Sequence, residues 1–169
     1  MIIEQLTYRT NHQDFLAKMQ EAVVDRLVFL PDEDSTFEKE GVPFSFRYCS
    51  AVIVYSDKGN FKLHTCMADN GLETLWLSPA EEEVNTEATF FIPVNAQVKT
   101  IHFSDGHEGY PFRLQIEFER TNIFLYAADI HRNDDDSYKY MMNDEMILAF
   151  EDEDEAKRFE TLVGYQSKS

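Results

Sequence analysis

From residue 42 onward, apolar residues recur at every second position in a series of short segments separated by turn residues. This alternation is typical of β-strands, whose successive side chains point to opposite faces of a sheet. Segments 43–56 and 61–68 flank the turn residues 57–60 and predict one antiparallel hairpin. Segments 112–119 and 123–131 predict a second one. The pattern therefore indicates a curved antiparallel sheet of about six to seven strands.

The two ends of the chain repeat apolar residues at intervals of three and four, as helices do. Residues 11–30 predict one helix, with Asn11 as its N-cap, after a short strand at 2–8. The stretch that begins at Asp152 predicts a closing helix, because Asp152 and Glu155 have the spacing of a capping box. Strands between two terminal helices indicate an α+β fold, and residues 1–169 are expected to form a single domain.

The composition indicates a folded chain without a membrane segment. Hydrophobic residues make up 43% of the chain, too many for an acidic disordered tail, and no apolar run is long enough to cross a bilayer. The first residues lack the basic end and apolar run of a signal peptide. The chain has only two cysteines, and they stand outside any CxxC spacing. We therefore expect a cytoplasmic protein with free thiols.

The formal net charge of −17 argues against nucleic acids and anionic membranes as partners, because both attract basic surfaces. Three segments hold this surplus: 31–40 and 81–87 each carry a net charge of −4, and 129–155 carries −9. If they fold to the same side, they form a negative patch that attracts a basic protein. If they are scattered, they only keep the chain in solution.

The expected binding residues for a basic partner come from these segments. Tyr138 and Tyr140 are included because we expect residues 134–144 to form an exposed loop, on which tyrosine rings give contact area. The candidates are Asp32, Glu33, Asp34, Glu81, Glu82, Glu83, Asp134, Asp135, Asp136, Tyr138 and Tyr140.

A small-ligand pocket, with or without weak catalytic activity, is the alternative. Residues 44–56 are apolar on both faces, so this strand is either covered on both sides or lines a pocket between the sheet and the N-terminal helix. The lining candidates are Cys49, Tyr55, His64 and Trp76. A third alternative is a structural or homo-oligomeric domain whose acidity only maintains solubility.

Known catalytic and metal motifs do not fit the sequence. It has no glycine-rich phosphate loop, GxSxG or HExxH. An EF-hand loop starting at Asp134 fails because Tyr138 and Lys139 stand where a ligand and a glycine are required. The five histidines lack the spacing of zinc sites. His64 and Cys66 share a strand face, but a third orienting residue is missing. We expect no enzyme activity, no cofactor and no metal.

Residues 138–160, YKYMMNDEMILAFEDEDEAKRFE, resemble the endings of small acidic bacterial proteins that serve as immunity partners of toxins. In those endings a D-E pair opens the last apolar strand and a final helix follows. The resemblance implies a cytoplasmic single-domain inhibitor that covers a basic toxin site with acids, and it assigns no individual residues. Together with the charge pattern, it leads us to expect a non-enzymatic binding protein.

Overall fold

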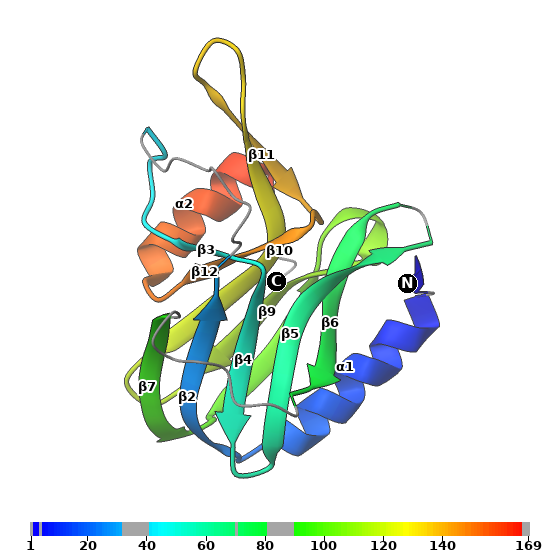
Figure 1. Cartoon of the computed structure of the whole chain (residues 1–169), viewed down its shortest axis with the longest axis vertical. Coiled ribbons are helices and arrows are strands. Elements are labelled where there is room, and N and C mark those ends of the chain that lie inside the picture. Colours follow the sequence, from blue (N-terminus) through cyan, green and yellow to red (C-terminus); the bar gives the residue numbers. More distant parts are fainter. Residues whose placement is uncertain (1, 4, 32–40, 70, 81–89, 167–169) are drawn as a thin grey trace.

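The computed structural model describes residues 2–3, 5–31, 41–69, 71–80 and 90–166, which form two β-sheets packed face to face with two helices (Figure 1). The elements are β1 (Ile2–Ile3), α1 (Gln5–Met19), β2 (Val23–Leu30), β3 (Arg47–Cys49), β4 (Ala51–Ser56), β5 (Gly59–Ala68), β6 (Glu73–Pro79), β7 (Phe90–Gln97), β8 (Thr100–Asp105), the 3₁₀ turn η1 (His107–Gly109), β9 (Pro111–Glu117), β10 (Asn122–Arg132), β11 (Tyr138–Met142), β12 (Met146–Phe150) and α2 (Glu153–Val163). The expected α+β class, with one helix near each end, is confirmed.

The strands divide into two sheets instead of the single sheet of six to seven strands expected from the sequence. The first sheet has the order β7-β2-β4-β5-β6, and β1 pairs in parallel with the end of β5. The second has the order β3-β12-β10-β9-β8, and β11 pairs with the far half of β10. The chain passes between the sheets at Ser50, which separates β3 from β4. The predicted hairpins β4–β5 and β9–β10 are both present.

The main core lies between the two sheets. Leu27 of β2, Val52 of β4 and Leu125 of β10 are fully buried there, and Phe15 of α1 joins them from the side. A second apolar cluster lies on the outer face of the second sheet, under α2, where Phe159 is fully buried. The fold therefore has three layers where α2 covers the second sheet and two elsewhere.

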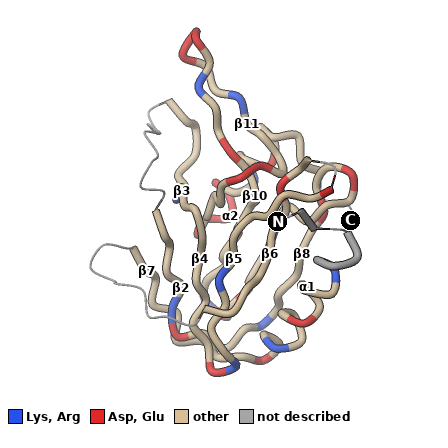
Figure 2. The backbone as a smooth tube through the Cα atoms, turned by 45° about the vertical axis from the view of Figure 1, so that its right-hand side comes forward, with Lys and Arg blue, Asp and Glu red and all other residues tan. Residues whose placement is uncertain are grey.

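Helix α1 closes the side of the sandwich between β6 and β8 (Figure 2). Its His12 ring stacks on Phe103 of β8 at a centroid distance of 3.8 Å, and its Nε2 donates to Leu75 O of β6 at 2.7 Å. Asn11 is bonded to the backbone of Leu77, also on β6. The helix thus satisfies polar groups on the outer edge of β6 that would otherwise be open to another chain.

The predicted helix over 11–30 was wrong in its second half, and so was the strand at 2–8. The helix starts at Gln5 and ends at Met19, so Asn11 lies inside it and is not its N-cap. Residues 23–30 form β2, an inner strand of the first sheet that pairs with β4 and β7. Leu27 faces the inter-sheet core, whereas Val28 lies in an apolar cluster on the outer face. A strand buried on both faces is apolar at adjacent positions, which imitates a helical repeat.

The closing helix is as predicted at its start. The Asp152 side chain accepts hydrogen bonds from Asp154 N and Glu155 N, and Gly164 ends the helix in the left-handed conformation at φ 80°. Inside the helix, Ala156 and Phe159 are buried, whereas Leu162 is exposed. Neither α1 nor α2 has the length and apolar character of a membrane-spanning helix.

Candidate functional site

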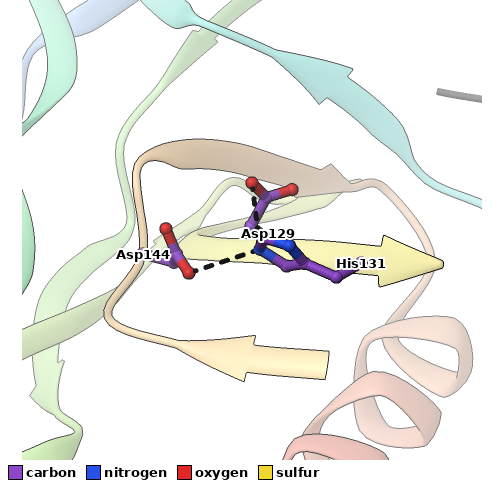
Figure 3. Close-up of side chains that lie close together, drawn as sticks. All are labelled: Asp129, His131 and Asp144. Atoms are coloured by element: carbon purple, nitrogen blue, oxygen red, sulfur yellow. Dashed lines mark ion pairs between the residues drawn. The ribbon is translucent and has the colours of Figure 1, made fainter. Parts of the chain in front are cut away.

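Three ionisable side chains converge beside the base of the β10–β11 hairpin (Figure 3). Asp129 and His131 come from β10, and Asp144 comes from the turn between β11 and β12. His131 Nε2 lies 3.6 Å from Asp129 Oδ2 and 3.6 Å from Asp144 Oδ2. One oxygen or nitrogen from each side chain lies within 4.8 Å of the others. We call these three residues the Asp129 cluster.

Strand periodicity and one tight turn explain why the three residues meet. Asp129 and His131 are two residues apart on one strand and therefore point to the same face. Asp144 follows Asn143, whose φ of 58° turns the chain back from β11 into β12. The Asp144 N–H then donates to Ala127 O of β10 at 3.3 Å, which holds the turn beside the strand.

Separate hydrogen bonds orient both carboxylates. Asp129 Oδ1 accepts from the Tyr48 hydroxyl and from Ile130 N, the latter at 2.7 Å. Asp144 Oδ1 accepts from Glu145 N at 2.7 Å. In both residues Oδ1 is held by protein donors, and Oδ2 is the atom turned toward the imidazole of His131.

The Asp129 cluster spans the boundary between interior and solvent. Asp129 is only 6% exposed, whereas the side chains of Asp144 and His131 are 26% and 55% exposed. Burial raises the pKa of the Asp129 carboxyl, although hydrogen bonds from Tyr48 and Ile130 oppose this shift. The cluster therefore combines a fixed internal carboxylate with two groups that an ion or ligand can reach from solvent.

Two further acids, Glu73 and Glu145, lie near Asp144. Burial raises the pKa of Glu73 on β6, and the negative charges of Glu145 and Asp144 raise it further. Carboxylates from both sheets thus repel one another at this end of the sandwich, and a cation placed among them would relieve the repulsion.

Asn143 fixes the turn that carries Asp144. Its side chain is buried at 4% exposure. Its Nδ2 donates to Glu73 O at 3.1 Å, and its Oδ1 accepts from His107 N at 2.9 Å. Glu73 N in turn donates to Asn143 O at 3.0 Å. The turn is therefore tied to the first sheet and to the β8–β9 connection.

The predicted partner-binding residues that can be located lie on the β10–β11 hairpin. Asp134, Asp135 and Asp136 are exposed at its tip, which extends beyond the rest of the molecule (Figure 2). Asp136 forms an ion pair with Arg132 at 2.9 Å. Asp135 Oδ1 accepts from Ser137 N at 3.1 Å, and hydrogen bonds from Ser137 hold the pKa of Asp135 below its ordinary value.

The expected loop at 134–144 was wrong, because residues 138–142 form strand β11. Tyr138 and Tyr140 are therefore strand residues, half-buried and packed against the apolar cluster under α2. The ring of Tyr140 lies 5.7 Å from that of Phe44. Part of each ring thus supports the hairpin and is unavailable as contact area. The other predicted acids, Asp32, Glu33, Asp34, Glu81, Glu82 and Glu83, lie outside the described residues.

The four pocket candidates do not line one cavity wall. Cys49 is buried and faces the core between the sheets. Tyr55, His64 and Trp76 lie on the opposite, outer face of the first sheet, where His64 and Trp76 are directly paired across β5 and β6. The expected contact of Cys66 with His64 is present, with Sγ 3.7 Å from Nδ1.

A hollow of about 300 Å³ does lie next to α1, although other residues line it. It opens between α1 and β8, and His12, His102 and Asp105 are among its lining residues. The expected position beside the N-terminal helix therefore holds a hollow, but on the side of the second sheet.

Sequence reasoning missed the Asp129 cluster. The Asp129-x-His131 spacing on a strand was a usable signal, because it puts a carboxylate and an imidazole on one face. Asp144 and Tyr48 carried no comparable signal, since both reach Asp129 only through the pairing of distant strands.

No protein-family model, curated protein or solved structure that was compared with this chain matches it. Its function is therefore inferred from the geometry and chemistry of its own residues.

Proposed function

We propose that this protein is a non-enzymatic, cytoplasmic binding protein of the immunity type, which inhibits a basic toxin or nuclease by covering its cationic surface with acids. The observation that carries the proposal is the β10–β11 hairpin, which extends from the body and holds Asp134, Asp135 and Asp136 at its exposed tip (Figures 1 and 2). An acidic protrusion of this kind matches a concave, positively charged surface such as a nuclease cleft.

The hairpin is preorganised for binding. Five residue pairs, from Ala128 with Met142 to Arg132 with Tyr138, continue the second sheet into the protrusion. At the tip, Asn133 N donates to Ser137 O at 2.8 Å, and Asp136 N donates to Asn133 O at 3.1 Å. A segment that is already ordered loses little conformational entropy on binding, so more of the contact energy contributes to affinity.

The charge of the whole chain supports the same proposal. Arg132 and Lys139 offset part of the charge at the tip, so the attraction of a basic partner over distance comes mainly from the net charge of −17. Such a field accelerates association and weakens as salt is added. The aspartates at the tip then supply local charge complementarity, which fixes the orientation of the bound partner.

The test uses the product of the gene next to the one that encodes this chain, because immunity proteins act on a partner made in the same cell. Binding to that product is measured by surface plasmon resonance over a range of salt concentrations, for the native chain and for the triple variant Asp134→Asn, Asp135→Asn, Asp136→Asn. We expect the native chain to bind and the triple variant to bind about tenfold or more weakly.

A second triple variant controls for total charge. Asp14→Asn, Asp25→Asn and Glu119→Gln also remove three negative charges, from exposed positions outside the hairpin. The control variant is expected to associate slightly more slowly than the native chain and to dissociate at the same rate. Equal affinity of the hairpin variant and the native chain would refute the role of the hairpin.

A further inference from the structure

We propose that Asp129, His131 and Asp144 bind one divalent transition-metal ion, and that Zn²⁺ fits the site best. The three potential ligand atoms already converge, with His131 Nε2 at 3.6 Å from an oxygen of each carboxylate (Figure 3). The proposal concerns the base of the β10–β11 hairpin and does not depend on the inhibitor function proposed for its tip.

The separations are close to those of a zinc site. Zn²⁺ binds imidazole nitrogen and carboxylate oxygen at about 2.0–2.2 Å, so two ligand atoms in a tetrahedral site stand roughly 3.3–3.6 Å apart. The two distances of 3.6 Å to His131 Nε2 are at the upper end of this range. The two carboxylates lie within 4.8 Å of each other, so a bound ion would also draw the partly exposed Asp144 side chain inward.

One of the three potential ligands is a buried carboxylate. Asp129 is more than nine-tenths buried, and its Oδ2 lies in the cluster, 3.6 Å from His131 Nε2. Tyr48 and Ile130 hold the other oxygen, as outer partners commonly orient a metal ligand. A mostly buried carboxylate is stabilised by a cation placed against its Oδ2.

The donor set selects the class of metal. Ca²⁺ and Mg²⁺ prefer oxygen ligands throughout their coordination shells, whereas one of the three ligand atoms here is an imidazole nitrogen. One imidazole with two carboxylates suits Zn²⁺, and Mn²⁺ less tightly. Because His131 is 55% exposed, the remaining coordination position faces solvent and is open to water or to a ligand from another molecule.

The competing interpretation is a simple ion pair, in which a protonated His131 lies between two aspartates. Metal titration separates the two. The chain is treated with EDTA, dialysed, and titrated with ZnCl₂ by isothermal titration calorimetry, and the imidazole nitrogens are followed by ¹H–¹⁵N NMR. We expect one saturable Zn²⁺ per chain and a shift of the His131 signal.

Variants assign the binding to these residues. His131→Asn and Asp129→Asn each remove a ligand and are expected to abolish the saturable event. Tyr48→Phe removes a hydroxyl that orients Asp129 and is expected to weaken binding roughly tenfold. This intermediate result would support an oriented site, since a nonspecific acidic surface does not respond to the loss of a neutral hydroxyl.

Two variants act as controls. Cys66→Ser removes the thiol next to His64, a thiol–imidazole pair that could also hold Zn²⁺, and His102→Asn removes an exposed histidine of β8. Both are expected to bind Zn²⁺ like the native chain. The hairpin variant Asp134→Asn, Asp135→Asn, Asp136→Asn should also retain it, so this site and the proposed function can fail separately.

Three outcomes would overturn the proposal. The first is an absence of saturable Zn²⁺ binding to the native chain. The second is native-like binding by His131→Asn, and the third is loss of binding in Cys66→Ser. A circular dichroism spectrum of each variant confirms that the chain is folded before it is titrated.

Discussion

The side-chain amide of Asn11 is bonded twice to the backbone of Leu77: Nδ2 donates to Leu77 O at 2.7 Å, and Oδ1 accepts from Leu77 N at 3.0 Å. The amide offers one donor and one acceptor, as the backbone of a neighbouring strand would. Strand β6 pairs with β5 on one side, and on its other side α1 takes the place of a further strand. At its β6 side the first sheet is therefore covered by helix α1 instead of ending in an open strand edge.

Replacing Asn11 with Asp should destabilise the fold by about 1–3 kcal/mol, because the carboxylate has no N–H for Leu77 O and places a charge beside it. Chemical denaturation measures the change, and hydrogen exchange of the Leu77 amide reports the β6 edge. Gln13→Glu makes the same chemical change at an exposed position of α1 and should stay within about 0.5 kcal/mol of the native chain. Equal stabilities for the two variants would contradict this account of the edge.

Asn143→Gly should cost about 2–4 kcal/mol, because it leaves the buried groups Glu73 O and His107 N without their side-chain partner. Glycine keeps the left-handed backbone, so the loss reports the hydrogen bonds and not strain. Asn95 is also left-handed, with φ 47°, but is exposed. Asn95→Gly should therefore be nearly neutral. Thermal unfolding compares the two variants, and a neutral Asn143→Gly would contradict the role of Asn143 as the tie between the sheets.

The stability of the fold should fall between pH 6.5 and pH 4 partly because of His12. Burial lowers the pKa of His12 from its ordinary value of 6.5 to about 4. In this window the unfolded chain binds a proton that the folded chain does not, so unfolding becomes easier as pH falls. Over this window His12 lowers the free energy of unfolding by about 3 kcal/mol in total, and it adds no further loss below pH 4.

Replacing His12 tests this linkage. His12→Gln lowers stability at every pH. It should nevertheless flatten the plot of unfolding free energy against pH between pH 6.5 and pH 4, relative to the native chain. His107→Gln changes an exposed histidine and should run parallel to the native curve. Urea denaturation at several pH values measures both. If the His12→Gln curve ran parallel as well, the buried imidazole would not be the cause.

Asp152→Ala should destabilise the chain by about 1 kcal/mol, because the Asp152 carboxylate caps the first free N–H groups of α2. Asp154→Ala removes the same charge from the first turn without removing the cap, and only its interaction with the helix dipole is lost. This second change should cost a few tenths of a kcal/mol. If thermal unfolding showed Asp154→Ala to be more destabilising than Asp152→Ala, the acids at the start of α2 would act through charge alone.

Local features were predictable from the sequence because their causes lie within a few residues. The cap at Asp152 and the β4–β5 hairpin at its turn are of this kind, and both are present. The prediction of a helix over 11–30 was wrong in its second half, because propensity and periodicity do not distinguish an amphipathic helix from a strand buried on both faces. Pairing with β4 and β7 decided in favour of strand β2.

The candidate sites divide in the same way. The sequence by itself determined that Asp129 and His131 share one strand face and that three aspartates occupy one turn, because strand and turn geometry are local. Tertiary structure alone brought Asp144 and Tyr48 to Asp129, and it converted the expected tyrosine loop into strand β11. These contacts depend on which strands pair and in which register, and that choice is made by burial of apolar surface over the whole chain.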